Sequence, residues 1–104
     1  MCGISGVLSF DGKYNKEDVL KMNKILSHRG PDDEGTYFDE FIGLGHRRLS
    51  IIDLSKTGHQ PMSCGPERYW IIFNGEVYNY LEIREDLIKY GFNFHSNTDT
   101  EVVL

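Results

Sequence analysis

The alternation of apolar and polar residues predicts a strand followed by a helix at the start of the chain. Residues 2–10 alternate imperfectly and begin without strong helix formers, which is typical of a strand. Asp11-Gly12 is a turn sequence. From Asn15, a candidate N-cap, we expect an amphipathic helix to run to about Ser27. Val19, Met22 and Leu26 fall at helical spacing on one face, with Ile25 beside them, and this stripe is predicted to be core.

The next segment predicts a loop and two short strands. Residues 28–35 contain two glycines and a proline, so we expect a loop there. Short strands are expected around residues 36–38 and 42–49, with Asp39-Glu40 as the turn between them.

The second half of the chain predicts one more strand and a second helix. Residues 55–68 are polar and rich in turn formers, whereas residues 69–73 form a continuous apolar run of the kind expected in a strand buried on both faces. Asn74-Gly75 ends that run. The second helix is expected to begin near Asn79 and to stop at Gly91. Its apolar face consists of Tyr80, Ile83, Leu87 and Tyr90.

The last residues predict the first turn of a third helix. Thr98 and Glu101 have capping-box spacing, and an apolar run follows them. Because a single turn cannot bury an apolar face, we expect the sequence to be truncated. Strands combined with amphipathic helices predict a sheet that is covered by helices on at least one face.

Composition and charge narrow the classes of function. With 39% apolar and 26% charged residues among 104 positions, the chain has the balance of one small soluble globular domain. The formal charge of −5 argues against a nucleic-acid surface, because binding to phosphates requires clustered Lys and Arg. The one dense basic run, residues 46–48, is too short for such a surface.

No segment predicts export or insertion into a membrane. Asp11, Lys13 and Lys16 interrupt any apolar stretch near the start, which is unlike a signal peptide. No apolar run approaches membrane-spanning length. The two cysteines, Cys2 and Cys64, form no disulfide framework. We therefore expect a cytoplasmic protein with reduced thiols.

Cys2 is the first candidate for chemistry. Removal of Met1, which a small second residue permits, would place a thiol and a free α-amine on the same residue. Since an ordinary α-amine has a pKa of about 7.7–8.0 and an ordinary thiol one of about 8.5, a single residue can supply both the base and the nucleophile. Enzymes with N-terminal nucleophiles use this arrangement. The alternative is that Cys2 is simply a small apolar residue at the start of the chain.

Asn74-Gly75 is the second candidate. Acyl transfer from an amide requires hydrogen-bond donors that are fixed around the carbonyl oxygen as it gains negative charge. An Asn side-chain amide and a Gly backbone N–H at the end of a strand can supply such donors. The same dipeptide is the commonest signal for a two-residue hairpin turn, so the local sequence leaves both interpretations open.

Several motifs in a fixed order carry a resemblance that covers essentially the whole chain. The motifs are Met1-Cys2-Gly3-Ile4, His28-Arg29-Gly30-Pro31-Asp32, His46-Arg47-Arg48-Leu49-Ser50-Ile51-Ile52-Asp53, Gln60-Pro61-Met62, Asn74-Gly75-Glu76-Val77-Tyr78-Asn79 and Thr98-Asp99-Thr100-Glu101. Together they resemble the class II glutamine amidotransferase domain, and specifically that of glutamine-hydrolysing asparagine synthetases. The resemblance implies that residues 1–104 are the N-terminal part of such a domain. The implied fold class is α+β, an αββα sandwich of antiparallel sheets as in N-terminal-nucleophile hydrolases, present here in truncated form.

The resemblance also implies a role for each site residue. These roles are carried by Cys2 (nucleophile), Asn74 and Gly75 (oxyanion hole), Arg48 (substrate α-carboxylate), Glu76 and Asp99 (substrate α-ammonium), and the backbone of Ile51 and Ile52 (pocket wall). The set is chemically consistent, because a free amino acid is a zwitterion and its pocket needs charges of both signs. A planar, permanently charged guanidinium suits the α-carboxylate.

The implied reaction is hydrolysis of L-glutamine in two steps. The Cys2 thiolate attacks the side-chain amide, ammonia leaves, and water then releases glutamate from the thioester. The ammonia would pass to a synthetase domain, in cis or in trans, that adenylates a carboxylate, with aspartate as the default acceptor. ATP and Mg²⁺ belong to that synthetase domain, and no glycine-rich pyrophosphate-binding loop occurs here. We therefore expect no cofactor in this chain.

No metal site is expected either. The residues that could serve as ligands match no zinc spacing: His28, His46, His59 and Cys64.

Two other classes of function are alternatives. One is a non-catalytic regulatory or interaction module of the same fold, against which Cys2, Asn74 and Asp99 argue jointly. The other is an N-terminal-nucleophile hydrolase of a different amide. The positive charge of Arg48 and the negative charges of Glu76 and Asp99 argue against that one, because together they suit a free amino acid.

Overall fold

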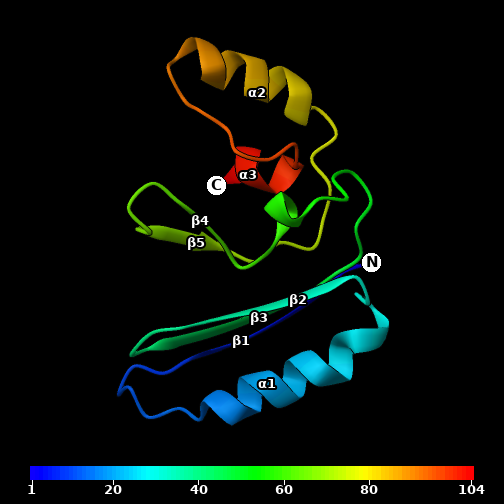
Figure 1. Ribbon diagram of the computed structural model, residues 1–104. Helices are drawn as coiled ribbons and strands as arrows, with labels where there is room; N and C mark the ends of the chain where they lie inside the picture. The colour runs from blue at the N-terminus through cyan, green and yellow to red at the C-terminus, as the bar shows by residue number, and fades with distance from the viewer.

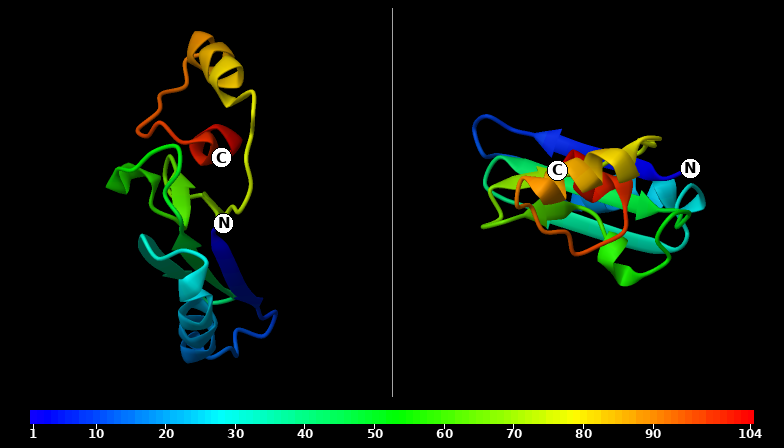
Figure 2. Two further views of the ribbon diagram at one scale, coloured as in Figure 1. Left: turned by 90° about the vertical axis from the view of Figure 1, so that its right-hand side faces the viewer. Right: turned by 90° about the horizontal axis from the view of Figure 1, so that it is seen from above.

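The computed structural model describes all 104 residues, which form stacked layers (Figure 1). Helix α1 (Lys16–Ile25) covers one face of a three-stranded sheet. A ribbon of two strands, β4 (Met62–Cys64) and β5 (Tyr69–Ile71), lies over the other face. Helices α2 (Tyr80–Lys89) and α3 (Asp99–Val103) lie beyond this ribbon. The stack is elongated, at 43 × 30 × 19 Å, and Figure 2 (left) shows the N-terminus midway along it.

The start of α1 is capped as the sequence predicts. The Asn15 side chain accepts a hydrogen bond from the Glu17 backbone N–H at 3.0 Å, which satisfies one of the free donors at the helix end. The helix ends at Ile25 and one 3₁₀ turn, Leu26–His28, continues the chain. The predicted helix is therefore confirmed, with an end about two residues earlier than expected.

The apolar stripe of α1 is buried only in part. Val19 is fully buried against the sheet, and Met22 and Leu26 are half-buried. Ile25 is 72% exposed, so the prediction that it belongs to the core is wrong. It lies six residues after Val19, about 120° around the helix at 3.6 residues per turn, and therefore faces away from the sheet.

Strand β3 (Ile42–Arg48) is the centre of the three-stranded sheet. Strands β1 (Gly3–Leu8) and β2 (Asp33–Phe38) pair with it antiparallel, one on each side, in the order β1-β3-β2. The strand predicted around residues 36–38 begins three residues earlier, because the first residue of β2 pairs with the last residue of β3. Because β1 and β3 are antiparallel, the beginning of β1 and the end of β3 lie at the same end of the sheet.

The ribbon is less buried than the sequence suggests. The run 69–73 was expected to form a strand buried on both faces, but β5 ends at Ile71, and Tyr69 is 55% exposed. That prediction is wrong: β5 pairs with β4 alone, and no residue of either strand is buried. Strand β4 lies within residues 55–68, which the sequence identifies only as polar and rich in turn formers. One aromatic stack joins the ribbon to the sheet: the rings of Tyr37 and Trp70 lie 3.9 Å apart between centroids.

Helix α3 begins with the predicted cap. The Thr98 side chain accepts a hydrogen bond from the Glu101 backbone N–H at 3.3 Å. The Glu101 carboxylate does not complete the reciprocal half of the capping box, because it accepts from the backbone N–H groups of His95 and Ser96 instead. Arg84 of α2 donates to the Ser96 carbonyl at 2.7 Å and so ties α2 to the segment before α3.

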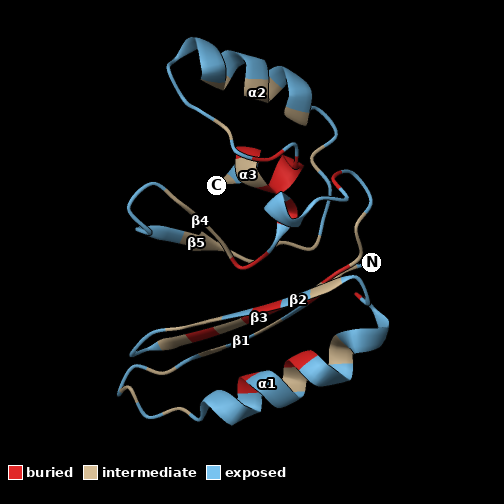
Figure 3. Ribbon diagram, viewed as in Figure 1, coloured by how far each residue is buried: buried red, intermediate tan, exposed pale blue.

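Helix α2 is confirmed, but its predicted apolar face is not enclosed. The helix stops where expected, since Gly91 has a φ of +96° and its N–H bonds to the Ile88 carbonyl. No residue of α2 is buried, and the outermost residue of the stripe, Tyr90, is largely exposed. Figure 3 shows α2 as the most exposed element of the stack.

Half of the 18 buried residues have polar or charged side chains. The other nine are glycines, Pro61, Val19 and Val102. All of these polar residues except Asn23 belong to the second half of β3, to the loop that follows it, or to α3 and the residues directly before it: His46, Arg48, Asp53, Gln60, Ser96, Thr98, Asp99 and Thr100. Polar groups are rarely buried without a structural or functional reason, so this region is the candidate site.

The fold class predicted from the sequence is confirmed. The structure is α+β with antiparallel sheets, and the order of its layers, helix, sheet, ribbon and helices, is that of the expected αββα sandwich. None of its helices has both the length and the apolar character required to cross a lipid bilayer.

Candidate active site

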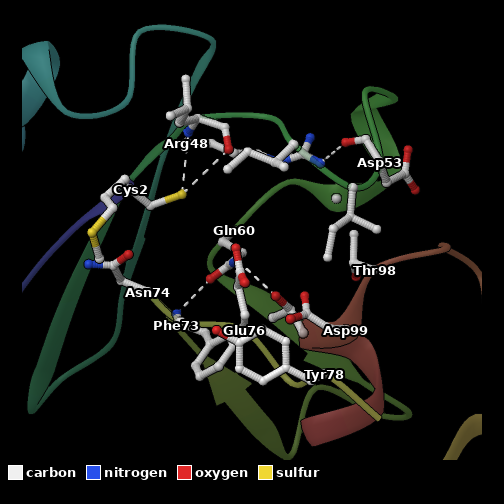
Figure 4. Close-up of a pocket in the computed structure, with 17 residues that line it drawn as sticks. Cys2, Arg48, Asp53, Gln60, Phe73, Asn74, Glu76, Tyr78, Thr98 and Asp99 are labelled. Carbon is white, nitrogen blue, oxygen red and sulfur yellow. Dashed lines mark hydrogen bonds between the residues drawn. The ribbon is translucent and has the colours of Figure 1, made fainter. Parts of the chain in front are cut away.

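A pocket of about 400 Å³ lies between the start of β1, the end of β3 and the first turn of α3 (Figure 4). All eight residues to which the sequence assigns a role line this pocket: Cys2, Arg48, Ile51, Ile52, Asn74, Gly75, Glu76 and Asp99. They come from four separate segments of the chain, so folding alone brings them together. Their individual roles stay predictions.

Cys2 lies directly before β1 at the wall of the pocket. Its Sγ accepts a hydrogen bond from the Leu49 backbone N–H at 3.3 Å, and its S–H lies within reach of the Leu49 carbonyl oxygen, 3.7 Å from Sγ. Arg29 donates through Nε to the Cys2 carbonyl oxygen at 3.2 Å. Met1 is exposed and lines the same pocket. Removal of Met1 would therefore leave the new α-amine beside the thiol, at the pocket wall.

Asn74 and Gly75 follow β5 and lie on the same side of the pocket as Cys2 (Figure 4). The chain does not return into a paired strand after Gly75 but continues to α2, so the hairpin-turn interpretation is wrong. The Gly75 backbone N–H makes no hydrogen bond within the chain. This donor is available to a ligand.

The main chain of Phe73, the residue before Asn74, is held through both its N–H and its carbonyl. The Phe73 N–H donates to Gln60 Oε1 at 2.7 Å, and the Phe73 carbonyl accepts from His46 Nε2 at 3.2 Å. Burial lowers the pKa of His46, which favours the neutral ring. The proton is on Nε2, because a carbonyl oxygen can only accept, and Nδ1 has no partner. His46 thus acts as a fixed structural donor.

The Arg48 guanidinium is held in place by backbone carbonyls. Nη1 donates to the Ser55 carbonyl at 2.7 Å, and Nη2 donates to the Asp53 carbonyl. A Cβ at Gly58 would overlap this guanidinium, so a residue without a side chain is required there. Arg48 is 7% exposed, and no carboxylate forms an ion pair with it. Its positive charge is therefore available to an anionic group in the pocket.

The loop after β3 is organised by Asp53. Its carboxylate accepts hydrogen bonds from the Ser55 backbone N–H at 2.8 Å, the Thr57 hydroxyl at 3.2 Å and the Asn97 backbone N–H at 3.1 Å. These hydrogen bonds, those from Ser55 first, hold the pKa of the Asp53 carboxyl well below its usual range. Ile51, earlier in the same loop, lines the pocket with an exposed side chain.

Asp99 carries a buried negative charge on the opposite side of the pocket. It is the first residue of α3 and is 6% exposed. Its Oδ2 accepts a hydrogen bond from the Val77 backbone N–H at 2.9 Å. No Lys, Arg or His forms an ion pair with it. Glu76, the other predicted acidic group, lines the pocket but is exposed.

The pocket therefore contains a buried cation and a buried anion that do not pair with each other. Arg48 and Asp99 lie in different walls, and each retains an unneutralised charge. Unpaired charges in a protein interior are unfavourable unless a ligand or solvent compensates them. A small zwitterion provides both compensating charges.

Two residues that hold the pocket together, Gln60 and Asp53, were not assigned a role from the sequence. Both belong to motifs noted above. Membership of these motifs was the one sign in the sequence that the two residues matter. Their hydrogen-bond partners are distant in sequence, at 13 residues or more for Gln60 and at 44 residues for the bond between Asp53 and Asn97. The structure contains no group of three or more His, Cys, Asp or Glu side chains that could hold a metal ion.

The sequence of this chain was compared with those of known protein families and proteins. The sequence pattern of the glutamine amidotransferase domain matches residues 1–104. The chain is similar over its whole length to asparagine synthetase [glutamine-hydrolyzing] 1 of Bacillus subtilis (49% identity, covering 17% of that protein). It is also similar to the putative asparagine synthetase [glutamine-hydrolyzing] 2 of Methanocaldococcus jannaschii (44%, covering 23%) and to asparagine synthetase [glutamine-hydrolyzing] 3 of Bacillus subtilis (39%, covering 17%).

The chain thus spans between 17% and 23% of the length of these relatives. The match of the domain pattern, however, covers every residue of the chain. The resemblance inferred from the ordered motifs is therefore confirmed. This chain belongs to the glutamine amidotransferase domain family.

Proposed function

We propose that this chain hydrolyses the side-chain amide of L-glutamine through a thioester on Cys2 and delivers ammonia to an amide-forming synthetase domain. One observation carries the proposal: the buried, unpaired charges of Arg48 and Asp99 line the same pocket as the Cys2 thiol. Family membership supports glutamine amidotransfer in general. The pocket supports a free amino acid as the substrate.

Binding orients the substrate by its two charges. The guanidinium of Arg48 binds the α-carboxylate, and the carboxylate of Asp99 binds the α-ammonium, with Glu76 at the exposed side. The backbone of Ile51 and Ile52 forms the wall beside the α-carboxylate. Glutamine bound in this way extends its side-chain amide toward Cys2 and Asn74, on the far side of the pocket (Figure 4).

The reaction begins with attack by sulfur on the amide carbon. After Met1 is removed, the α-amine of Cys2 accepts the thiol proton, and Sγ forms a bond to the carbon. The carbonyl oxygen becomes an oxyanion that accepts hydrogen bonds from the Asn74 side-chain amide and the Gly75 N–H. The C–N bond then breaks, the nitrogen takes the proton from the α-amine, and ammonia leaves.

Water completes the cycle. It adds to the glutamyl thioester, the α-amine again acts as base, and the C–S bond breaks to release glutamate and the free thiol. The relatives are named asparagine synthetases, so we propose a synthetase domain that amidates aspartate, in cis or in trans, as the consumer of the ammonia.

The proposal is tested by glutamate release from L-glutamine in the protein that carries this chain. Cys2→Ala should abolish release, whereas Cys64→Ala is a matched control, because Cys64 is a half-buried thiol of β4 outside the pocket. Hydroxylamine added during turnover should be converted to glutamyl hydroxamate in the wild type only if a thioester forms. Intact mass of the purified protein reports whether Met1 has been removed.

Three outcomes would contradict the proposal. Absence of glutamate release from a folded protein that lacks Met1 would exclude the glutaminase activity. Release that is unaffected by Cys2→Ala would exclude the mechanism. Equal loss in Cys64→Ala and Cys2→Ala would show that the effect does not report the pocket thiol.

A further inference from the structure

Gln60 has a place in the pocket that the proposed reaction does not explain. It lines the pocket, it is 5% exposed, and both ends of its carboxamide are hydrogen-bonded (Figure 4). Oε1 accepts from the Phe73 backbone N–H at 2.7 Å, and Nε2 donates to Thr100 Oγ1 at 3.2 Å. The Phe73 N–H can only donate, so it determines which end of the carboxamide is the oxygen.

The two hydrogen-bond partners of Gln60 are sequence neighbours of proposed site residues at opposite ends of the pocket. Phe73 directly precedes Asn74, at the end of the pocket where the amide reacts. Thr100 directly follows Asp99, at the end where the α-ammonium binds. One other side-chain hydrogen bond joins these two segments: the Asp99 carboxylate accepts from the Val77 backbone N–H, two residues after Gly75. Gln60 provides a second link, at Phe73 directly before the oxyanion donors.

Burial makes this connection persistent. A carboxamide that is withdrawn from water and loses one of its hydrogen bonds leaves an unsatisfied polar group, which is unfavourable by more than the bond contributes when it is made. The Phe73 carbonyl is held independently by His46, so the peptide before Asn74 has little freedom to move. The carboxamide of Gln60 therefore acts as a spacer of fixed length between the two walls.

We propose that Gln60 is a positioning residue that sets the distance between the oxyanion donors at Asn74-Gly75 and the carboxylate of Asp99. It thereby selects amide substrates in which an α-ammonium lies at the distance found in glutamine. The inference rests on the proposed function, since it assumes that glutamine spans these two walls. Gln60 contacts neither the amide nor the ammonium in this scheme and acts through its neighbours.

The test compares two ligands of equal length, L-glutamine and glutaramate, which lacks the α-amino group. Their dissociation constants are measured by calorimetry in a Cys2→Ala background, where no turnover occurs. Gln60→Met has nearly the same shape and removes both hydrogen bonds. We expect it to weaken glutamine binding by about tenfold or more, as loss of one or two hydrogen bonds implies, and glutaramate binding by less than about threefold. The readout is the dissociation constant of glutaramate divided by that of glutamine. A loss of affinity that both ligands share, such as one caused by partial unfolding, cancels in this ratio.

Two further variants keep the test decisive if Gln60→Met folds poorly. Thr100→Val removes only the hydroxyl that Gln60 binds and should lower the same ratio, and Thr100→Ser should restore it. Asn23→Leu is the matched control, because Asn23 is a buried amide of α1 that does not line this pocket. It should leave the ratio unchanged even where it lowers stability.

The inference is overturned if Gln60→Met and Thr100→Val bind glutamine and glutaramate with the wild-type ratio. It is also overturned if the wild-type pocket does not prefer glutamine. Failure of the proposed function is recognised separately, because a protein that binds glutamine but never hydrolyses it fails the glutamate-release assay while the binding ratio still tests Gln60.

Discussion

The carboxylate of Asp53 accepts a hydrogen bond from the backbone N–H of Asn97 at 3.1 Å, although the two residues are 44 positions apart. The bond joins the loop after β3 to the segment that leads into α3. The main-chain carbonyl of Asp53 also accepts from Arg48. One residue therefore links the wall that carries the positive charge to the wall that carries the negative charge.

The first prediction concerns this link. Asp53→Asn keeps one acceptor oxygen but replaces the other with a donor, so the bond from Asn97 is lost. We expect the free energy of unfolding at pH 7 to fall by about 1–3 kcal/mol, the usual effect of losing hydrogen bonds to a buried carboxylate. Urea unfolding of the 104-residue chain, followed by the fluorescence of its single tryptophan, Trp70, measures the change.

The same variant makes a prediction about pH. The pKa of Asp53 is lowered in the folded state, so its contribution to stability is present above the unfolded pKa of about 3.9 and is lost as the pH falls below that value. The difference in unfolding free energy between wild type and Asp53→Asn should therefore narrow from about pH 5 downward. A difference that stays constant down to pH 3 would contradict this explanation.

A second pH dependence, with a different window, is expected from His46. Because burial lowers its pKa, the unfolded chain binds a proton below about pH 6.5 that the folded chain does not, and stability falls as the pH decreases from 7 to 5. His46→Gln retains a donor for the Phe73 carbonyl but does not titrate. We expect the variant to lose this slope, which for one group is at most about 1.4 kcal/mol per pH unit. Equal slopes in both proteins would refute the assignment.

Two adjacent arginines give a matched test of substrate binding. Arg48→Lys keeps the charge but loses the planar fork that the Asp53 and Ser55 carbonyls hold, so the KM for glutamine should rise by about 10–100-fold. Arg47 bonds to the Gly30 carbonyl and to Glu34 and does not line the pocket, so Arg47→Lys should change KM by less than about threefold. Steady-state kinetics of glutamate release measure KM for both variants. A similar rise in KM in Arg47→Lys and Arg48→Lys would contradict the proposed role of Arg48 in binding the substrate.

The stack of Tyr37 on Trp70 predicts how the ribbon is attached to the sheet. Tyr37→Leu removes the aromatic pair and should lower the unfolding free energy by about 0.5–1.5 kcal/mol beyond the effect of buried area. Tyr37→Phe retains the ring and should unfold close to wild type. The near-ultraviolet circular dichroism of Trp70 offers a second measure, because it should weaken in Tyr37→Leu only.

Local structure was predictable where the cause is local. The caps at Asn15 and Thr98 are confirmed because each involves residues two or three positions apart. Burial was less predictable: Ile25 and Tyr69 were expected inside and lie outside. A periodic pattern identifies an apolar face, but it does not say whether another element covers that face.

The candidate site likewise has features that were predictable from the sequence and features that were not. The amino-acid sequence by itself determined the family, through motifs whose order is visible along the chain, and with it eight of the 17 residues that line the pocket. Only the tertiary structure decided that Gln60 and Asp53 connect the walls, because each bonds to backbone or side-chain groups that are distant in sequence. Such bonds depend on how the layers stack, and no local pattern of residues encodes the partner across that distance.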